Sequence, residues 1–225
     1  PLKIVTNSGN GAAGHVIDCI ERVFEEKSIP IEFVKINHTP DGKFPKGIPN
    51  PLLPENREET SHSVINHRAD IGLAWDGDFD RCFFFDHQGK FVDSYYIIGL
   101  LAEYFLHNNK GECVIYDPRL IWNIEEVVDM YGGISVQNRV GHVFMKPRMR
   151  EENAIYGGEI SGHHYFHRFS YNDSGMIVWL IVIQIMSQKN LSLKDLIQSR
   201  KELYPCSGEI NFVVNNASQI ICALE

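Results

Sequence analysis

Strand and helix patterns alternate from the first residues of the chain, and this alternation leaves few architectures open to it. The apolar run Leu2–Thr6 predicts a strand, and the apolar side chains of Ala12–Glu26 recur at helical spacing. A second strand is predicted over Ile31–Ile36. Strands that alternate with helices are typical of α/β folds, in which helices cover a sheet.

The same alternation returns in the second half of the chain. A helix is predicted over Tyr95–His107, a strand over Glu112–Tyr116 and a further helix over Ile124–Tyr131. With 225 residues, of which 44% are hydrophobic, the chain is long enough for about two domains. We therefore predict an α/β protein of two tandem domains, residues 1–90 and 91–203, each with a mixed sheet covered by helices.

Two further segments shape this prediction. Prolines and glycines crowd residues 37–56, which predicts a long, stiffened loop before a helix over Glu55–Asn66. The stretch Met176–Met186 is almost entirely apolar and predicts a helix that is buried on most sides. Either Asp173 or Ser174 is suited to cap the start of that helix.

An acidic stretch follows the apolar run Ile71–Trp75, which predicts a buried strand. Asp76, Asp78 and Asp80 occupy alternate positions, and three carboxylates within one turn repel one another unless a counter-charge is bound. An oxygen-only ligand set favours Mg²⁺, which completes its shell with water or phosphate. We therefore predict a Mg²⁺ site with a phosphate partner, and Arg81 stands where it can hold a phosphate oxygen.

Other interpretations of the acidic stretch are weighed by spacing. An EF-hand loop needs Gly at its sixth position and Glu at its twelfth, whereas counting from Asp76 gives Arg81 and His87, so this interpretation is excluded. A haloacid-dehalogenase phosphatase also has Asp-x-Asp after a strand but expects a small residue next, where Phe79 stands. That phosphatase and a solvated acidic turn remain alternatives.

Gly9, Gly11 and Gly14 form a GxGxxG pattern between the first strand and the first helix, as in dinucleotide-binding proteins. A dinucleotide site also needs an acidic residue at the end of the second strand to bind the ribose, but the residue after that strand is Asn37. We interpret the glycines as a tight turn between strand and helix.

Charge and cysteine content narrow the function classes. The net charge is −8 and no basic run is present, so binding to nucleic acid is not expected. Five cysteines without a CxxC pair suit a reducing compartment. Residues 1–14 show no secretory pattern, and the longest apolar run, Met176–Ile183, is too short to span a bilayer. We expect a cytoplasmic protein that does not associate with membranes.

Three motifs, in order, resemble the α-D-phosphohexomutase (phosphoglucomutase/phosphomannomutase) family. Residues 76–81, Asp-Gly-Asp-Phe-Asp-Arg, resemble its metal loop, and residues 158–163, Gly-Glu-Ile-Ser-Gly-His, resemble its sugar-recognition loop. Val140–His142 with Lys146 resembles an active-site turn of the family. Arg119 follows Asp-Pro where many relatives place a Lys that faces the substrate.

Carried over residue by residue, the resemblance implies three sets of site residues. The implied Mg²⁺ ligands are Asp76, Asp78 and Asp80. The implied substrate-binding residues are Glu159, Ser161 and His163. The implied catalytic residues are Arg81, Arg119, His142 and His163, of which the two histidines are the acid/base candidates.

The resemblance also implies a reaction, in which phosphoserine exchanges a phosphoryl group with a hexose phosphate through a bisphosphate intermediate. It is closest to the bacterial branch that interconverts mannose 6-phosphate and mannose 1-phosphate for GDP-mannose and lipopolysaccharide synthesis. Phosphoglucomutase and phosphoglucosamine mutase are alternatives within the family. A non-catalytic sugar-phosphate-binding module is the alternative outside enzymes.

Two motifs of the family are missing from the sequence. Its members have four domains, of which the first carries serine in a Ser-His-Asn-Pro segment and the fourth carries a phosphate-binding loop. The chain resembles the second and third domains, with residues 204–225 as the truncated start of the fourth. We therefore expect a fragment that is inactive alone, because it has no phosphoserine.

Overall fold

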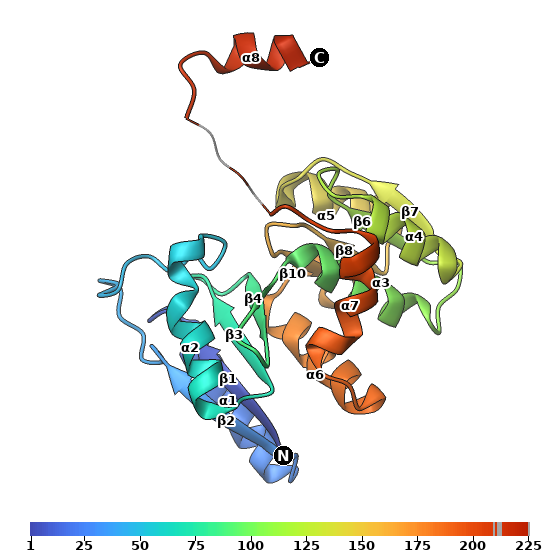
Figure 1. The fold of residues 1–225 in the computed structure, drawn as a ribbon. Coiled ribbons are helices and arrows are strands. Elements are labelled where there is room, and N and C mark those ends of the chain that lie inside the picture. Colours follow the sequence, from blue (N-terminus) through green and yellow to red (C-terminus); the bar gives the residue numbers. More distant parts are fainter. Residues whose placement is uncertain (209, 211–212, 225) are drawn as a thin grey trace.

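The computed structural model describes residues 1–208, 210 and 213–224, and its strands form two five-stranded sheets (Figure 1). Residues 1–92, here called the first unit, build one sheet, and residues 93–203, the second unit, build the other. Each sheet is mixed and is flanked by helices. The predicted α/β class with two tandem units is confirmed.

The first sheet has the strand order β2-β1-β3-β4-β5. β1 is parallel to β2 and to β3, whereas β4 runs antiparallel to β3 and to β5. The strands are β1 (Leu2–Asn7), β2 (Ile31–Ile36), β3 (Ile71–Trp75), β4 (Cys82–Asp86) and β5 (Phe91–Val92). The helices are α1 (Ala13–Glu26), α2 (Glu58–His67) and the short 3₁₀ helix η1 (Pro54–Asn56).

The central strand β3 is buried at every position, which explains its uninterrupted apolar sequence. The proline-rich segment forms no strand or helix over residues 37–53, as predicted. Its end differs from the prediction, because the α-helix expected from Glu55 starts at Glu58. Pro54–Asn56 forms a separate 3₁₀ helix, with its proline at a helical start where no N–H is needed.

The second sheet has the strand order β10-β9-β8-β6-β7. β6 is parallel to β7 and to β8, whereas β9 runs antiparallel to β8 and to β10. The strands are β6 (Cys113–Tyr116), β7 (Ile134–Gln137), β8 (Tyr156–Gly158), β9 (His164–Phe166) and β10 (Asn172–Asp173). The helices are α3 (Ser94–Leu106), α4 (Trp122–Met130), α5 (His142–Glu151), α6 (Gly175–Lys189), α7 (Leu193–Leu203) and the 3₁₀ helix η2 (His167–Phe169).

Helix α6 joins the two units through a shared apolar core. Trp179 on α6 and Trp75 on β3 are both fully buried and belong to the same core cluster. Phe33 on β2 meets Trp179 edge to face, with ring centroids 6.2 Å apart. The Trp75 indole Nε1 donates a hydrogen bond to the Gly175 carbonyl oxygen, at 2.9 Å. The second unit is thereby packed directly against the first sheet.

Of the two predicted caps of α6, Ser174 is the one used, because its hydroxyl oxygen accepts hydrogen bonds from the backbone N–H groups of Met176 and Ile177. Helices α5 and α7 were not predicted. In α5 the signal is weak, since the helix contains Pro147 and buries only Met145 and Met149.

Residues 204–225 carry α8 (Ala217–Leu224), which stands apart from both units and buries no side chain (Figure 1). The resemblance also implies the first strand of the fourth domain from about Tyr204 onward, and no strand is found among the described residues of this segment. Three residues of the Ser207–Phe212 stretch, namely Glu209, Asn211 and Phe212, lie outside the described residues.

Within the described part of the chain, no single helix is long and apolar enough to cross a membrane. Helices α6 and α7 taken together have the length and composition of a span, but they meet at a 97° bend. The apolar residues of α6 are explained by the core, in which most of its first three turns are buried.

Candidate active site

The three aspartates of the acidic stretch lie in the loop that connects β3 to β4, here called the metal loop (residues 76–81). Their carboxylate oxygens include a set in which one oxygen of each lies within 4.8 Å of the other two. Asp76 is buried, Asp80 is half-buried and Asp78 is exposed. The Oδ1 atom of Asp80 is buried and lies 3.7 Å from Arg81 Nε in an ion pair, but it has no hydrogen-bond partner among the described residues. A compact set of oxygens with one unsatisfied buried member fits a hard divalent cation.

Phe79 gives the metal loop its turn. Its φ of 54° lies in the left-handed region, which a non-glycine residue adopts at a cost of about 1–3 kcal/mol. The Phe79 N–H donates to the Asp76 carbonyl oxygen, at 3.3 Å, and the Phe79 side chain packs against the core. This anchoring offsets the strained backbone and directs the flanking carboxylates toward one point.

Arg81 is hydrogen-bonded to Asp76, the first residue of the metal loop. Its Nε donates to Asp76 Oδ2 at 2.6 Å, and its backbone N–H donates to Asp76 Oδ1 at 3.3 Å. Burial raises the pKa of Asp76 to about 6, because the nearby Arg81 offsets only part of the desolvation. Asp76 is therefore about half charged near pH 6, and a further positive charge bound beside it favours the charged form at lower pH.

The stretch that resembled the sugar-recognition loop connects β8 to β9, and we call residues 159–163 the sugar loop. Glu159 in this loop is only 2% exposed. One of its carboxylate oxygens accepts a hydrogen bond from the backbone N–H of Gly141, and the other accepts one from the Tyr165 hydroxyl at 2.7 Å. Ser161 is half-buried, and its Oγ lies 2.9 Å from Nδ1 of His163.

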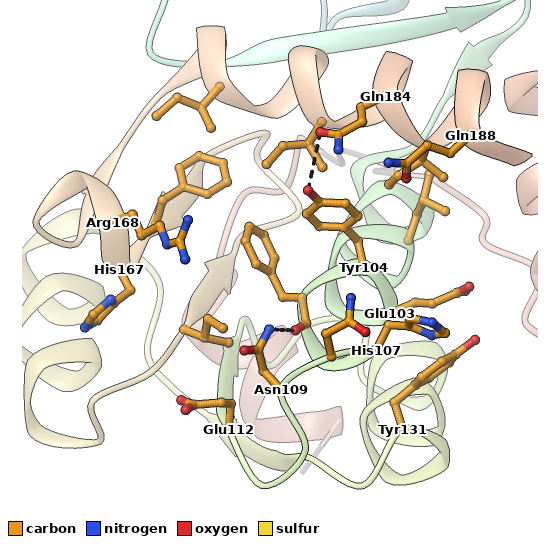
Figure 2. Close-up of a pocket in the computed structure, with 18 of the residues that line it drawn as sticks. Glu103, Tyr104, His107, Asn109, Glu112, Tyr131, His167, Arg168, Gln184 and Gln188 are labelled. Carbon is orange, nitrogen blue, oxygen red and sulfur yellow. Dashed lines mark hydrogen bonds between the residues drawn. The ribbon is translucent and has the colours of Figure 1, made fainter.

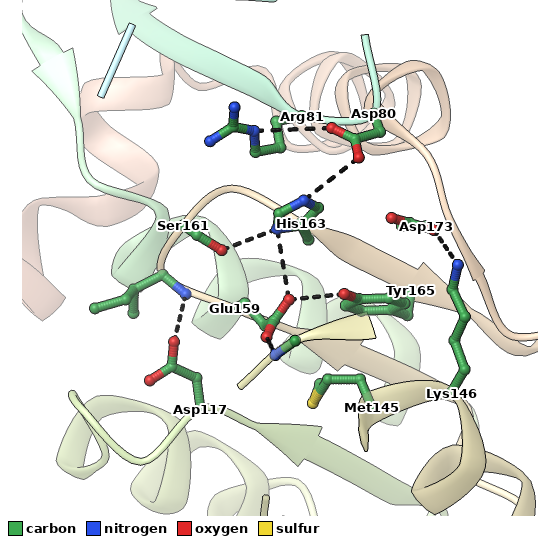
Figure 3. Close-up of polar contacts among 12 residues, drawn as sticks. Asp80, Arg81, Asp117, Met145, Lys146, Glu159, Ser161, His163, Tyr165 and Asp173 are labelled. Carbon is green, nitrogen blue, oxygen red and sulfur yellow. Dashed lines mark hydrogen bonds and ion pairs between the residues drawn. The ribbon is translucent and has the colours of Figure 1, made fainter. Parts of the chain in front are cut away.

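His163 links the two loops (Figure 3). Its Nε2 lies 3.4 Å from Asp80 Oδ2, and its Nδ1 lies 3.5 Å from Glu159 Oε2. Burial lowers the pKa of His163, but the hydrogen bond and charge of Asp80 and the charge of Glu159 outweigh burial, so the net shift is upward. The same contact with His163 lowers the pKa of Asp80. A backbone bridge between Arg81 and His163 holds the metal loop and the sugar loop against each other.

Arg119 lies at the end of β6, beside the sugar loop. The fully buried Asp117 accepts hydrogen bonds from the Arg119 backbone N–H and from Arg119 Nε, both at 2.9 Å. The other Asp117 oxygen, Oδ2, accepts from the Ile160 N–H at 3.1 Å. One carboxylate thus fixes both the exposed Arg119 and the sugar-loop backbone.

His142 is the first residue of α5 and its side chain is exposed. The residue before it, Gly141, has a φ of 107°, which favours glycine, and donates its N–H to Glu159. The backbone at His142 is thus tied to the sugar loop, while its imidazole makes no hydrogen bond or ion pair to the residues that the structure describes.

Sequence reasoning missed Tyr165 in this site, and it named Lys146 without the partner that the structure gives it. Tyr165 binds Glu159, and Lys146 forms an ion pair with Asp173 at 2.8 Å (Figure 3). The first could have been found, because residues 159, 161, 163 and 165 alternate and extended residues two apart share a side. The pair of Lys146 and Asp173 joins α5 to β10 and has no local signal.

A cavity of about 930 Å³ lies elsewhere in the second unit, between α3, α6 and η2 (Figure 2). Phe105, Phe166 and Ile181 contribute apolar side chains to it, and Glu103 and Arg168 contribute charges. None of the predicted site residues lines this cavity. The candidate active site is therefore defined by the chemistry of the two facing loops and not by this hollow.

The fold and the site together define a class of protein: two α/β units of the same sheet order, with a carboxylate loop from one facing a polar loop from the other. The models of two domains of one known family match this chain. Alpha/beta/alpha domain II of phosphoglucomutase/phosphomannomutase matches residues 1–89, and domain III matches residues 93–204. The chain belongs to the phosphoglucomutase/phosphomannomutase family.

Individual relatives agree with this assignment. A curated phosphomannomutase of Escherichia coli is 54% identical over 224 residues, which are 100% of this chain and 49% of that protein. The chain thus spans about half the length of the curated relatives it matches. A crystal structure of a phosphoglucomutase/phosphomannomutase family protein from Burkholderia thailandensis is 31% identical and superimposes with a TM-score of 0.79, over 92% of this chain and 43% of that one.

A more distant structure shares the fold. Aspergillus fumigatus N-acetylphosphoglucosamine mutase, solved in complex with GlcNAc-6P and magnesium, is 13% identical with a TM-score of 0.63, over 88% of this chain and 49% of that one.

Proposed function

We propose that this chain is the central part of a phosphomannomutase, which interconverts mannose 6-phosphate and mannose 1-phosphate through a phosphoserine and a bisphosphate intermediate. The observation that carries the proposal is the contact of His163 with both Asp80 and Glu159. The His163 side chain thus contacts both the metal loop, which is suited to a cation and phosphate, and Glu159 of the sugar loop, which is suited to sugar hydroxyls. Two curated relatives, which are 54% and 56% identical to this chain over the aligned 224 and 222 residues, are named phosphomannomutases.

In this proposal Asp76, Asp78 and Asp80 hold Mg²⁺, and the bound ion supplies positive charge to the phosphoryl oxygens. The clustered oxygens, the Oδ1 of Asp80 that accepts no hydrogen bond from the described residues, and the presence of magnesium in a solved relative support this ligand set. Arg81, already paired with Asp76, adds a second positive charge at the same place. Such charges act chiefly on the transition state of phosphoryl transfer, where negative charge spreads over the oxygens.

The second unit binds and orients the sugar. Glu159 accepts hydrogen bonds from the sugar hydroxyls, and Ser161 can donate to them or accept from them. A substrate that lacks one of these hydroxyls loses the corresponding hydrogen bond. Arg119, held by Asp117, adds a fixed positive charge that attracts the substrate phosphate.

Proton transfer to or from the reacting hydroxyl falls to a histidine. His163 lies between the metal loop and Glu159, whereas the His142 imidazole is exposed and makes no hydrogen bond or ion pair with the described residues of either loop. A general acid or base must lie within hydrogen-bond reach of the proton it moves. We therefore assign this role to His163 and keep His142 as the second candidate.

The setting of the enzyme is part of the proposal. Residues 1–90 form the domain with the metal loop, residues 91–203 form the domain with the sugar loop, and residues 204–225 open a further domain. No Ser-His-Asn-Pro segment occurs in these 225 residues, so the phosphoserine comes from outside them. The five cysteines form no disulfide, which agrees with a cytoplasmic enzyme that supplies mannose 1-phosphate for GDP-mannose and lipopolysaccharide.

The experiment compares the 225-residue chain with the full-length protein that contains it. With Mg²⁺, a hexose bisphosphate activator and mannose 6-phosphate, we expect turnover by the full-length protein and none by the chain alone. Turnover by the chain alone would overturn the assignment of phosphoserine to another region. A full-length protein that hydrolyses the sugar phosphate without forming mannose 1-phosphate would favour the phosphatase alternative.

A further inference from the structure

Two glycines that lie outside the metal loop pack directly against its backbone. Gly11 belongs to the turn between β1 and α1, and Gly175 is the first residue of α6. One comes from the first unit and the other from the second. Neither glycine is among the residues proposed to bind the metal or the sugar.

Gly11 meets the loop at Gly77. A Cβ atom on residue 11 would lie 2.6 Å from the Gly77 carbonyl oxygen, a distance that side chains do not tolerate. The neighbouring Ala12 N–H donates a hydrogen bond to the same oxygen, at 3.2 Å. Space, and not an unusual backbone angle, therefore requires glycine at position 11.

Gly175 meets the other side of the loop. A Cβ atom on residue 175 would lie 2.5 Å from the Phe79 carbonyl oxygen and 2.9 Å from the carbonyl carbon of Arg81. The Gly175 carbonyl accepts the hydrogen bond from Trp75 Nε1, and Trp75 is the last residue of β3 before the loop begins. The loop is therefore fixed at its entry by Trp75 and along its backbone by Gly175.

We propose that Gly11, Gly175 and Trp75 are positioning residues that hold the metal loop in the conformation that binds Mg²⁺. The inference rests on the proposed metal site and adds that its affinity depends on packing between the two units. It also assigns a role to the glycine turn that resembled a dinucleotide fingerprint, since Gly11 of that pattern leaves room for the Gly77 carbonyl oxygen of the metal loop.

The physical reason lies in the demands of the ligand set. Mg²⁺ accepts little deviation from octahedral geometry, and three carboxylates left to themselves move apart. The loop also contains the left-handed Phe79, which persists only where the surroundings determine the backbone. Moving the loop by the several tenths of an ångström that a new methyl group requires therefore disturbs the ligand oxygens.

The test uses Gly11→Ala and Gly175→Ala, with Gly42→Ala as the matched control, because a Cβ at residue 42 meets no atom within 4 Å. Mg²⁺ affinity is measured by titration calorimetry, the mobility of residues 76–81 by amide hydrogen exchange, and folding by circular dichroism and thermal unfolding. Alanine has a higher helix propensity than glycine, so Gly175→Ala does not weaken α6 itself.

We expect Gly11→Ala and Gly175→Ala to weaken Mg²⁺ binding about 10- to 100-fold, as when groups that orient metal ligands are replaced, and to speed exchange in residues 76–81. Gly42→Ala should change neither. Unchanged affinity and unchanged exchange in the two loop variants would overturn the proposal. A wild-type chain that binds no Mg²⁺ would refute the metal site, and the exchange rates would still decide whether the glycines hold the loop.

Trp75→Phe covers the case in which an alanine variant does not fold. It removes the N–H donor to Gly175 but keeps an aromatic ring in the core. We expect a smaller loss of affinity in the same direction and faster exchange at residues 76–81. A folded Trp75→Phe variant with wild-type affinity and wild-type exchange would remove Trp75 from the proposal.

Discussion

The two units share one sheet plan and differ in the loop that carries the chemistry. β2-β1-β3-β4-β5 and β7-β6-β8-β9-β10 match strand for strand, including which neighbours are parallel and which antiparallel. The metal loop joins the third and fourth strands of this plan in the first unit, and the sugar loop joins the equivalent strands in the second. A common scaffold therefore presents different chemistry at one topological position.

The equivalent loops also differ in how their acidic groups are held. In the metal loop Asp78 is exposed and Asp80 Oδ1 accepts no hydrogen bond from the described residues, its contact being an ion pair with Arg81 at 3.7 Å, so the loop is open to a further ligand. In the sugar loop both oxygens of Glu159 already accept protein hydrogen bonds. The metal loop therefore holds one exposed acid, Asp78, beside two acids that are ion-paired, whereas the acid of the sugar loop is hydrogen-bonded through both of its oxygens.

Removing charge from the open loop should have the largest effect. In the full-length enzyme we expect Asp78→Asn to abolish turnover and Mg²⁺ binding at this loop, because a ligand is lost. The free energy of unfolding should change by no more than about 0.5 kcal/mol, since Asp78 is exposed and the substitution relieves repulsion. Steady-state kinetics, calorimetry and urea unfolding measure the three quantities. The exposed Asp129→Asn serves as the control, and near wild-type turnover in Asp78→Asn would exclude Asp78 from the site.

Removing charge from the sugar loop should have a smaller effect. We expect Glu159→Gln to lower kcat/KM by a factor that corresponds to about 1–3 kcal/mol of lost transition-state stabilisation, as for the loss of a charged hydrogen-bond partner. The decrease should be similar for mannose and glucose phosphates, because in the proposed reaction the sugar binds in two orientations and we expect the loop to contact the hydroxyls at C3 and C4. The control is Glu151→Gln, at an exposed residue. A large change in the ratio of kcat/KM for the two sugars would mean that Glu159 distinguishes C2.

The support of Glu159 can be tested apart from its charge. Tyr165→Phe removes the hydroxyl that donates to Glu159 and keeps the ring, so we expect kcat/KM to fall by about 0.5–1.5 kcal/mol. The same substitution combined with Glu159→Gln should add little, because the two residues act through one hydrogen bond. Tyr171→Phe, whose hydroxyl binds Asn153, is the control. Full additivity in the double variant would show that Tyr165 does not act through Glu159.

The sequence predicts what is local in these loops. Three alternating aspartates after an apolar strand, and Glu159 with Ser161 two residues apart, are patterns within a few residues, and the structure places each set together. The contact of Asp80 with His163 joins residues from different units, and no spacing along the chain encodes it.

Two other misses have physical causes as well. Helix α5 contains Pro147 and only two buried methionines, so its helical period is faint. The glycine pattern of the first turn predicts a tight turn, but its contact with the metal loop depends on how β1 and β3 lie side by side. Such contacts follow from topology rather than from local sequence.

The last prediction compares equivalent positions in the two sheets. His164 faces Gly158 across β8 and β9, as Cys82 faces Trp75 across β3 and β4, and both are fully buried. Burial lowers the pKa of His164 to about 3, whereas burial raises the pKa of the Cys82 thiol. Both side chains are therefore neutral in the folded protein at pH 7, and only His164 takes up a proton on unfolding in mild acid.

The sign follows from that difference. The unfolded state binds a proton at His164 below a pKa of about 6.5 and the folded state does so only near 3, so this stability is present above pH 6.5 and is lost as the pH falls toward 3. The loss attributable to His164 should approach about 1.4 kcal/mol per pH unit. His164→Cys, which copies the equivalent residue of the first unit, should remove this slope from urea unfolding curves between pH 6 and pH 4, whatever its effect at pH 7. His15→Cys, at an exposed residue, is the control. An unchanged slope in His164→Cys would mean that His164 is protonated in the folded protein or is not buried, and the contrast between the two sheets would be lost.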